Sequence, residues 1–429
     1  MKKVETEIVV VGTGPGGATV ARELALRKHK VIMLEKGGWN NRLIGRVVSM
    51  GRITRLEKSR EGGIMGRGIT VGGSSVVFNG NAFDPPTWLK DELGIDITKQ
   101  VEEAKREAGV ALLPEDFYKN WRATQRLVNA AGELNIILNP QPKFILAEKC
   151  DPHCDDCMFG CKRGGKWTAR KFVFDALASG ATIFEKHEAK KVLIKGGKAV
   201  GVKVEGKSEI EEVRAEKVIL SAGGIGTPLI LQRSGIEAGK GFFIDPMNVV
   251  LGIGKEKGTW REMTFAYATD ELAEREGFLV GTVGAFIVWG AQLARHRSLR
   301  SLIKAVNMPK IMGLFTKIGD SAGGKINSDG TVEKPYTEED REKFRRGTEI
   351  CKKVLIRAGA KPESIMVAEN IGGHPGGTAA VGDVVDKNLQ VFGAGNLYVC
   401  DASVFPRSPA RPPTLTLIAL AKKLVGTIH

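Results

Sequence analysis

The chain has 429 residues, of which 42% are hydrophobic and 54 are glycine, about twice the usual share, so it can bury a large core in one elaborated domain or in two. Its formal net charge of +15 favours acidic partners, such as an anionic cofactor, an acidic redox protein or a membrane surface. The basic residues are spread along the chain and only 6% of residues are aromatic, which argues against a nucleic-acid platform. No apolar run reaches the ~18 residues of a membrane-spanning helix and no signal pattern opens the chain, so we expect a cytoplasmic protein.

The first predicted element is a buried strand over Glu7–Val11 that runs into a glycine-rich turn. The turn, Gly12-Thr13-Gly14-Pro15-Gly16-Gly17, leads into a helix-like stretch and then a second strand, Val31–Leu34, which ends on Glu35. This order of strand, G-x-G-x-x-G, helix, strand and acid predicts a dinucleotide-binding unit.

Each position of this fingerprint has a physical role. We expect Gly12 to permit the tight turn, Gly14 to let the backbone approach a pyrophosphate, and Gly17 to allow close helix–strand packing. The helix N-terminus attracts phosphate, and Glu35 can accept hydrogen bonds from an adenosine ribose that carries no phosphate. By itself the fingerprint leaves NAD and FAD both open.

Four of the six cysteines fall within one short segment, in the pattern Cys150-x3-Cys154-x2-Cys157-x3-Cys161. In a chain without a secretory signal, crowded thiols are expected to be metal ligands rather than disulfides. Such a compact run is more typical of a [4Fe–4S] cluster than of the two separated knuckles of a zinc site. A structural zinc, a loop without metal, or His153 in place of one thiol remain alternatives.

Glycines and cations accompany these cysteines. Glycines at 160, 164 and 165 would let the loop fold tightly around a bulky group. The cations Lys162, Arg163 and Lys166 would offset its negative charge.

Three further elements follow. Lys191–Val204 is predicted to form a hairpin with Gly196-Gly197 at its turn, and Thr337 is expected to cap a helix that continues to about Ala358. The stretch Trp289–Lys317 mixes apolar residues with the cations Arg295, Arg297, Arg300, Lys304 and Lys310, so it is expected either to cover the substrate channel, to touch a membrane surface, or to be the solvated face of core helices.

Several motifs occur in a fixed order along the chain. They are Val71-Gly72-Gly73-Ser74-Ser75, Phe78-Asn79-Gly80-Asn81, Val218–Pro228, His374-Pro375-Gly376-Gly377-Thr378 and Asn396–Pro406. Together with the fingerprint they resemble the glucose–methanol–choline (GMC) oxidoreductase family, and most closely its long-chain (fatty) alcohol oxidase-like branch. The resemblance covers nearly the whole chain.

The resemblance implies an α/β fold in which a Rossmann-like FAD-binding domain is joined to a smaller α+β substrate domain. It also implies that both domains are discontinuous in sequence. The FAD-binding domain would take about 1–85, 168–255 and 370–429, and the substrate side about 86–167 and 256–369, with the cysteine loop 150–161 in the latter.

The resemblance further assigns residues to FAD. The loop from Gly72 to Asn79 would wrap the pyrophosphate and ring, and Ala222 to Gly224 would pass close to the adenosine. Asp401 would bind the ribitol, although an N-cap of the last helix is an alternative role. The residues expected to contact FAD are Gly12, Gly14, Pro15, Gly16, Gly17, Glu35, Lys36, Gly72, Gly73, Ser74, Asn79, Ala222, Gly223, Asp401, Ala402 and Thr414.

The expected catalytic residues are His374 and Arg411. His374 matches the family's active-site histidine, and a neutral imidazole suits removal of an alcohol proton while a hydride leaves. The family's second catalytic position, usually Asn or His, is Pro412 here, which has no polar side chain. Arg411 beside it cannot act as a base, but it could stabilise a reduced anionic flavin or bind a substrate carboxylate.

These observations lead to one principal hypothesis and two alternatives. The principal hypothesis is an FAD-dependent dehydrogenase that takes a hydride from an alcohol-type small molecule, hydrophobic alcohols included. It would pass electrons through an iron–sulfur cluster to an external carrier such as an acidic redox protein. The alternatives are a flavin/iron–sulfur electron-transfer subunit of a larger complex, and a flavin-dependent reductase or isomerase of a hydrophobic alkene. Peripheral membrane contact and an oligomer are compatible with each.

Overall fold

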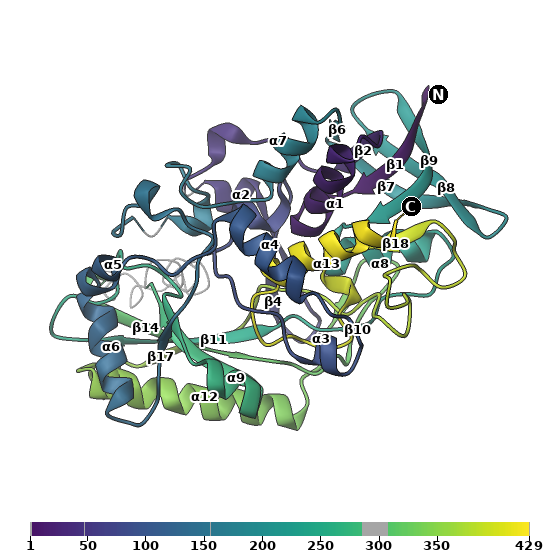
Figure 1. Ribbon diagram of the computed structural model, residues 1–429. Helices are drawn as coiled ribbons and strands as arrows, with labels where there is room; N and C mark the ends of the chain where they lie inside the picture. The colour runs from purple at the N-terminus through teal and green to yellow at the C-terminus, as the bar shows by residue number, and fades with distance from the viewer. Residues whose placement is uncertain (1, 47, 155, 285–307, 429) are drawn as a thin grey trace.

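A computed structural model describes residues 2–46, 48–154, 156–284 and 308–428. In that part of the chain, two large sheets and a small one form an α/β molecule. Figure 1 shows the seven-stranded sheet at the upper right, beside both termini, and the eight-stranded sheet at the lower left, above the long helix α12 (Glu338–Arg357). The expected α/β class, with a Rossmann-like sheet and a second unit, is confirmed.

The seven-stranded sheet has a parallel core to which an antiparallel hairpin is added. In spatial order its strands are β6 (Thr182–Glu185), β2 (Val31–Glu35), β1 (Lys2–Val11), β9 (Ile210–Leu220), β8 (Lys198–Gly206) and β7 (His187–Lys195), while β18 (Leu397–Val399) pairs with the end of β9. The β6–β2–β1–β9 pairs and the β18–β9 pair are parallel. Every residue of β2 and the last four residues of β1 are buried, as expected for the parallel core of such a sheet.

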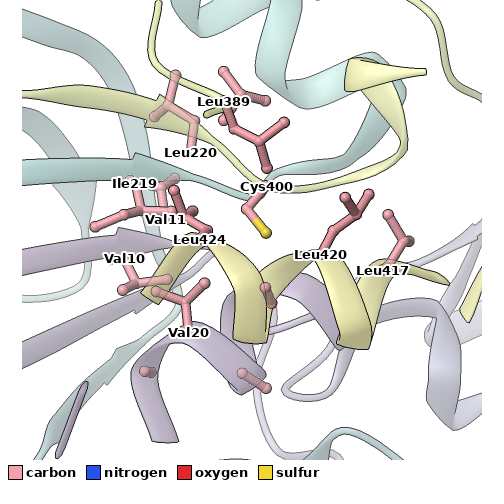
Figure 2. Packing of buried hydrophobic residues seen from close by; sticks show 14 of the residues in the cluster. Val10, Val11, Val20, Ile219, Leu220, Leu389, Cys400, Leu417, Leu420 and Leu424 are labelled. Atoms are coloured by element: carbon pink, nitrogen blue, oxygen red, sulfur yellow. The ribbon is translucent and has the colours of Figure 1, made fainter. Parts of the chain in front are cut away.

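Helices pack against this sheet around the glycine-rich turn. The helix α1 (Pro15–Leu26) contacts both α7 (Arg170–Ala178) and α13 (Thr414–Thr427), and α4 (Thr98–Ala108) contacts α13. Figure 2 shows leucines of α13 facing apolar residues of β1 and β9, with the thiol of Cys400 between the sheet and the helix. This packing holds the end of β1 and the start of α1 rigidly beside β9.

The eight-stranded sheet is mostly antiparallel. Its strands, in spatial order, are β3 (Thr54–Lys58), β4 (Ile64–Gly68), β17 (Met366–Gly372), β11 (Pro246–Ile253), β14 (Ile311–Ile318), β13 (Phe278–Val283), β12 (Tyr267–Ala268) and β5 (Asn139–Pro140). The helix α12 packs on its central strands, and α6 (Arg122–Gly132) and α9 (Asp270–Glu276) lie against α12 and β13 respectively. This sheet therefore positions the His374 motif, which follows β17, and Asp245, which precedes β11.

The remaining elements are short. A three-stranded sheet contains β10 (Lys240–Phe242), β15 (Gly324–Ile326) and β16 (Val332–Glu333). The short helices are α2 (Ser49–Arg52), α3 (Trp88–Asp91) and α5 (Glu115–Asn120), and α8 (Gly223–Arg233) begins in the 218–228 motif.

Two local predictions are confirmed. The expected hairpin is formed by β7 and β8, with Gly196 and Gly197 at the turn, both at positive φ. The expected helix is α12, where the side chain of Thr337 accepts a hydrogen bond from the backbone N–H of Asp340 and the Asp340 side chain accepts one in return. This reciprocal cap satisfies two N–H groups that a helix start otherwise leaves open.

The prediction for Trp289–Lys317 is wrong where it can be examined. Residues 285–307 lie outside the described residues. The end that is described is a short 3-10 turn (Met308–Lys310) followed by β14, which is buried along its length between β11 and β13. Its apolar residues fill a sheet rather than a lid or a membrane face. In the described ranges, no helix has both the length and the apolar character to cross a bilayer.

The domain boundaries stay a prediction. The strand β11 lies inside the segment 168–255 assigned to the FAD-binding domain, yet it hydrogen-bonds within the eight-stranded sheet. Its neighbour β17 crosses the expected boundary at residue 370. Along the chain, the change from the seven-stranded to the eight-stranded sheet therefore comes before residue 255, where the motifs place the domain boundary.

Candidate functional site

The glycine-rich turn between β1 and α1 leaves open space beside Gly14, at the start of the helix. Gly12 has a φ of +95°, and a Cβ atom there would lie 2.2 Å from the carbonyl oxygen of Ser221. Only glycine fits this turn. Gly14 caps α1 without a side-chain hydrogen bond, and no neighbouring heavy atom lies within 4 Å of the point where a side chain on it would begin. The first N–H groups of α1 are therefore available to an anion.

The loop Gly72–Asn79 lies directly against this turn. The backbone N–H of Gly72 donates to Thr13 Oγ1 at 3.0 Å. A Cβ atom on Gly73, which has a φ of +55°, would lie 2.9 Å from the Cα atom of Gly14. The side-chain oxygen of Asn79 is buried and has no hydrogen-bond partner in the part of the chain that the structure describes. Burying an oxygen in this way is costly unless a ligand donates to it.

Glu35 stands at the end of β2 and braces the turn. Its Oε2 accepts hydrogen bonds from the backbone N–H and the hydroxyl of Thr13, at 3.1 and 2.7 Å, and its Oε1 accepts one from Gly37. Burial raises the pKa of Glu35 above its usual value. Oε1 accepts a single bond and so keeps a lone pair for a ribose hydroxyl. The neighbouring Lys36 instead pairs with Glu188, 2.9 Å away.

Asp401 joins two of the motifs. Its Oδ1 accepts from the backbone N–H of Ser403, and its Oδ2 accepts from the backbone N–H of Gly223 and the hydroxyl of Thr227. It thus caps the 3-10 turn Ala402–Val404 and fixes the start of α8. The alternative that it caps the last helix is wrong, because α13 begins at Thr414, far from this carboxylate in sequence. A contact with ribitol stays a prediction.

The motif His374–Thr378 hydrogen-bonds to the start of α8 and to the turn Ala402–Val404. The hydroxyl of Thr378 donates to the carbonyl oxygen of Gly224 at 2.8 Å, and the backbone N–H of Gly377 donates to that of Ala402 at 3.1 Å. The structure therefore brings together segments that are about 150 residues apart in sequence.

His374 is held by a buried carboxylate. A quarter of its side chain is exposed, and its Nδ1 lies 2.7 Å from Oδ2 of the fully buried Asp245. Burial, followed by the charge of Lys317, lowers the pKa of His374 below its ordinary 6.5, and Asp245 partly opposes this. The imidazole is therefore neutral at pH 7 and can accept a proton.

Arg411 lies at the end of the loop before α13. Its Nη2 is 2.5 Å from Oε1 of Glu274 on α9, and only 12% of its side chain is exposed. Its Nε is buried and has no hydrogen-bond partner within the described ranges. One N–H group of the guanidinium thus donates to Glu274, and the Nε–H remains available to another acceptor.

The four clustered cysteines line one cavity of about 250 Å³. None of them is in a disulfide. Burial and the neighbouring thiols raise the pKa of Cys150 to about 12, and burial raises that of Cys154. The other residues that line the cavity are Ile145, Lys149, Asp151, Asp156, Lys162, Arg163 and Lys166.

The geometry does not support His153 as a ligand, because His153 is exposed and does not line the cavity. In the described residues, no three His, Cys, Asp or Glu side chains are arranged to hold a metal ion, so the iron–sulfur cluster, like a zinc ion, stays a prediction.

Lys166 connects the cavity to the loop Gly72–Asn79. Its ammonium is buried and donates hydrogen bonds to the carbonyl oxygens of Phe78 at 2.7 Å and Cys157 at 2.5 Å. Burial lowers its pKa to about 8, although Cys157 and Cys161 oppose the shift.

Sequence reasoning missed Asp245 and Lys317. Neither belongs to a recognised motif, but Lys317 is a lysine within an otherwise apolar strand, Ile311–Ile318. A charge at such a place must be paired, and that signal could have prompted a search for a buried carboxylate.

The chain matches known proteins over nearly its whole length. A model described as GMC oxidoreductase matches residues 7–256, and a second of the same description matches 331–421. An uncharacterized protein of Methanocaldococcus jannaschii is 29% identical over 98% of this chain and 99% of its own. Long-chain-alcohol oxidase FAO3 of Arabidopsis thaliana is 22% identical over 98% of this chain and 67% of its own. Pyridoxine 4-oxidase from Mesorbium loti has a similar structure, with a TM-score of 0.72 at 18% identity over 99% of both chains.

Proposed function

This chain belongs to the GMC oxidoreductase family of FAD-dependent oxidoreductases, and from that premise we propose that it oxidises an alcohol-type small molecule with His374 as the base. Bound FAD would supply the hydride acceptor. The observation that carries the proposal is the neutral, partly exposed imidazole of His374, next to the loops expected to hold the cofactor.

The described residues fit FAD. The open N-terminus of α1 can bind its pyrophosphate, and the side-chain oxygen of Asn79 can accept a hydrogen bond from an N–H or O–H group elsewhere on the cofactor. The loops that carry Gly14 and Gly73 touch each other, so a ligand bound at the turn would also contact the second loop. Glu35 keeps a lone pair for a ribose hydroxyl.

The alcohol class is supported by two considerations. A base that is neutral at pH 7 suits removal of a hydroxyl proton, which a charged imidazolium could not accept. A relative over nearly the whole chain bears the name long-chain-alcohol oxidase. Primary alcohols of increasing chain length are therefore the first substrates to examine.

The test is anaerobic bleaching of the bound flavin by a panel of primary alcohols. We expect at least one alcohol to bleach it, and the His374→Gln variant to be slower with its FAD retained. If dithionite bleaches the flavin and no alcohol does, the proposal is wrong.

We further propose that Cys150, Cys154, Cys157 and Cys161 hold a [4Fe–4S] cluster. Four thiols around one cavity supply the ligand set, and the cations Lys162, Arg163 and Lys166 offset its charge. In the described ranges no three His, Cys, Asp or Glu side chains are arranged to hold a metal ion, so the proposal rests on the four thiols and the cations beside them. Such a cluster would supply one-electron transfer, and the natural acceptor would then be an external carrier with an acidic surface.

Metal and sulfide analysis of anaerobically purified protein tests this part. About four irons and four sulfides per FAD are expected, from the usual composition of such clusters. One zinc, or no metal in protein that retains FAD, would reduce the loop to a structural element and leave the alcohol proposal intact.

Pro412 favours one other candidate. Because the family's second catalytic position has no side-chain donor or acceptor here, the chain fits an electron-transfer subunit whose catalytic centre lies in another protein. That candidate predicts a flavin that dithionite reduces and alcohols do not, with iron and sulfide present.

A further inference from the structure

Behind His374 a buried row of side chains runs from the imidazole through Asp245 to Lys317. Oδ2 of Asp245 lies 2.7 Å from Nδ1 of His374 and 2.7 Å from Nζ of Lys317. Asp245 is fully buried and Lys317 is 3% exposed. The ammonium of Lys317 also donates to the main-chain oxygen of Asp245, and the hydroxyl of Ser408 donates to its Oδ1.

A second buried pair fixes the position of Asp245. Its backbone N–H donates to Oδ1 of Asp320 at 2.9 Å, and that of Ile244 donates to Oδ2 at 3.1 Å. Asp320 in turn pairs with Lys334 at 3.2 Å, and both side chains are fully buried. Asp245 has a φ of +53°, a conformation that aspartate tolerates better than most residues. Its carboxylate therefore has little freedom to turn away from the imidazole.

We propose that Asp245 and Lys317 are positioning residues that fix the tautomer and the charge of His374. A carboxylate only accepts hydrogen bonds, so Nδ1 of His374 must carry the proton and Nε2 must carry the lone pair. An isolated buried carboxylate would also stabilise the imidazolium and protonate the ring near pH 7. Lys317 neutralises that carboxylate, and the imidazole stays neutral.

The consequence for the proposed reaction is specific. The side chain of Pro412, at the family's second catalytic position, has no polar group, and the hydrogen bond that orients the ring comes from Asp245. The role of Nε2 as the base rests on the proposed function, whereas the tautomer and the proton affinity of His374 do not. The charged groups next to the ring are Asp245 and Lys317, and Asp320 with Lys334 forms the next layer.

Histidine NMR on the FAD-bound protein tests the proposal without a substrate. The chain has only six histidines, and a His374→Gln variant assigns the resonance of His374. In the wild type we expect ¹⁵N shifts of a neutral ring protonated on Nδ1. A ring protonated on Nε2, or a mixture of tautomers, overturns the proposal even if no other variant folds.

Two substitutions should move the pKa of His374 in opposite directions. Lys317→Met removes the cation that repels the imidazolium, so the pKa should rise by about one unit, a tenfold gain in proton affinity. Asp245→Asn removes the anion that attracts it, so the pKa should fall. Lys317→Arg keeps the charge and is the matched control, with a pKa close to that of the wild type.

A merely structural role would weaken folding in both variants and would not give shifts of opposite sign. Unchanged values, or shifts in one direction, would refute the proposal. If the NMR results are as expected and no alcohol bleaches the flavin, the alcohol proposal fails and the assignment of Asp245 and Lys317 stands.

Discussion

The ammonium of Lys166 donates a hydrogen bond to the carbonyl oxygen of Phe78 at 2.7 Å, although the two residues lie 88 positions apart in sequence. Lys166 also donates to Cys157, so one buried cation bonds to both the cysteine loop and the loop expected to wrap the flavin. Removal of this side chain should disturb both proposed sites together.

We therefore expect Lys166→Met to lose stability and cofactors at once. The substitution leaves buried carbonyl oxygens without their donor, which should cost about 2–4 kcal/mol of unfolding free energy. Denaturant unfolding and the iron-to-FAD ratio measure the two effects. The control is Lys195→Met, which changes an exposed lysine that does not line the cavity and should change neither by much. Wild-type values for Lys166→Met would show that this residue does not link the sites.

The glycine-rich turn allows a test that separates folding from FAD binding. Gly14→Ala meets no neighbouring atom and keeps an ordinary φ, so we expect a loss of stability below about 1 kcal/mol. The added methyl group would occupy the space proposed for the pyrophosphate, so FAD retention after dialysis should fall about tenfold or more. Gly12→Ala, which would collide with Ser221, should instead destabilise the fold itself. Full FAD retention in folded Gly14→Ala would place the pyrophosphate elsewhere.

The lowered pKa of His374 predicts two pH effects. The rate of flavin reduction should fall only below the native pKa, which lies under 6.5, and His374→Gln should lower the rate by about 10²–10⁴-fold. Between that pKa and 6.5 the unfolded chain binds more protons at this residue than the native protein does, so stability should decline as the pH falls through this window. Stability curves of the wild type and His374→Gln measure the difference. Equal slopes for the two proteins across that window would contradict the lowered pKa.

The cysteine loop can be tested with a matched pair of variants. Cys157→Ser removes a cavity ligand, and we expect most of the iron and sulfide to be lost. His153→Ala changes an exposed residue outside the cavity, and iron should stay at the wild-type level. Loss of iron in the histidine variant alone would revive the alternative ligand set.

How far the sequence predicts this molecule depends on the range of the interactions. The β1–α1–β2 unit and the cap at Thr337 were predictable because their hydrogen bonds join residues close in sequence or follow a periodic pattern. The strand β14 was not predictable, because its lysine and apolar residues are buried only by pairing with two other strands, β11 and β13, and periodicity does not show this pairing. The same holds for Asp245, whose partners His374 and Lys317 lie 129 and 72 residues away.

Arg411 provides the last test, because its geometry separates two roles. One nitrogen pairs with Glu274, while the buried Nε has no partner among the described residues. If this N–H binds the negative charge of the reduced cofactor, Arg411→Ala should lower the flavin reduction potential and slow reduction about tenfold or more. If it binds a substrate carboxylate instead, substrate affinity should fall and the potential should stay the same. Glu274→Gln removes the ion pair and keeps the cation, so the potential should change little. The comparison therefore assigns any loss to the guanidinium rather than to its surface partner. An Arg411→Ala enzyme with the wild-type potential, rate and substrate affinity would limit Arg411 to holding α9 against the loop before α13.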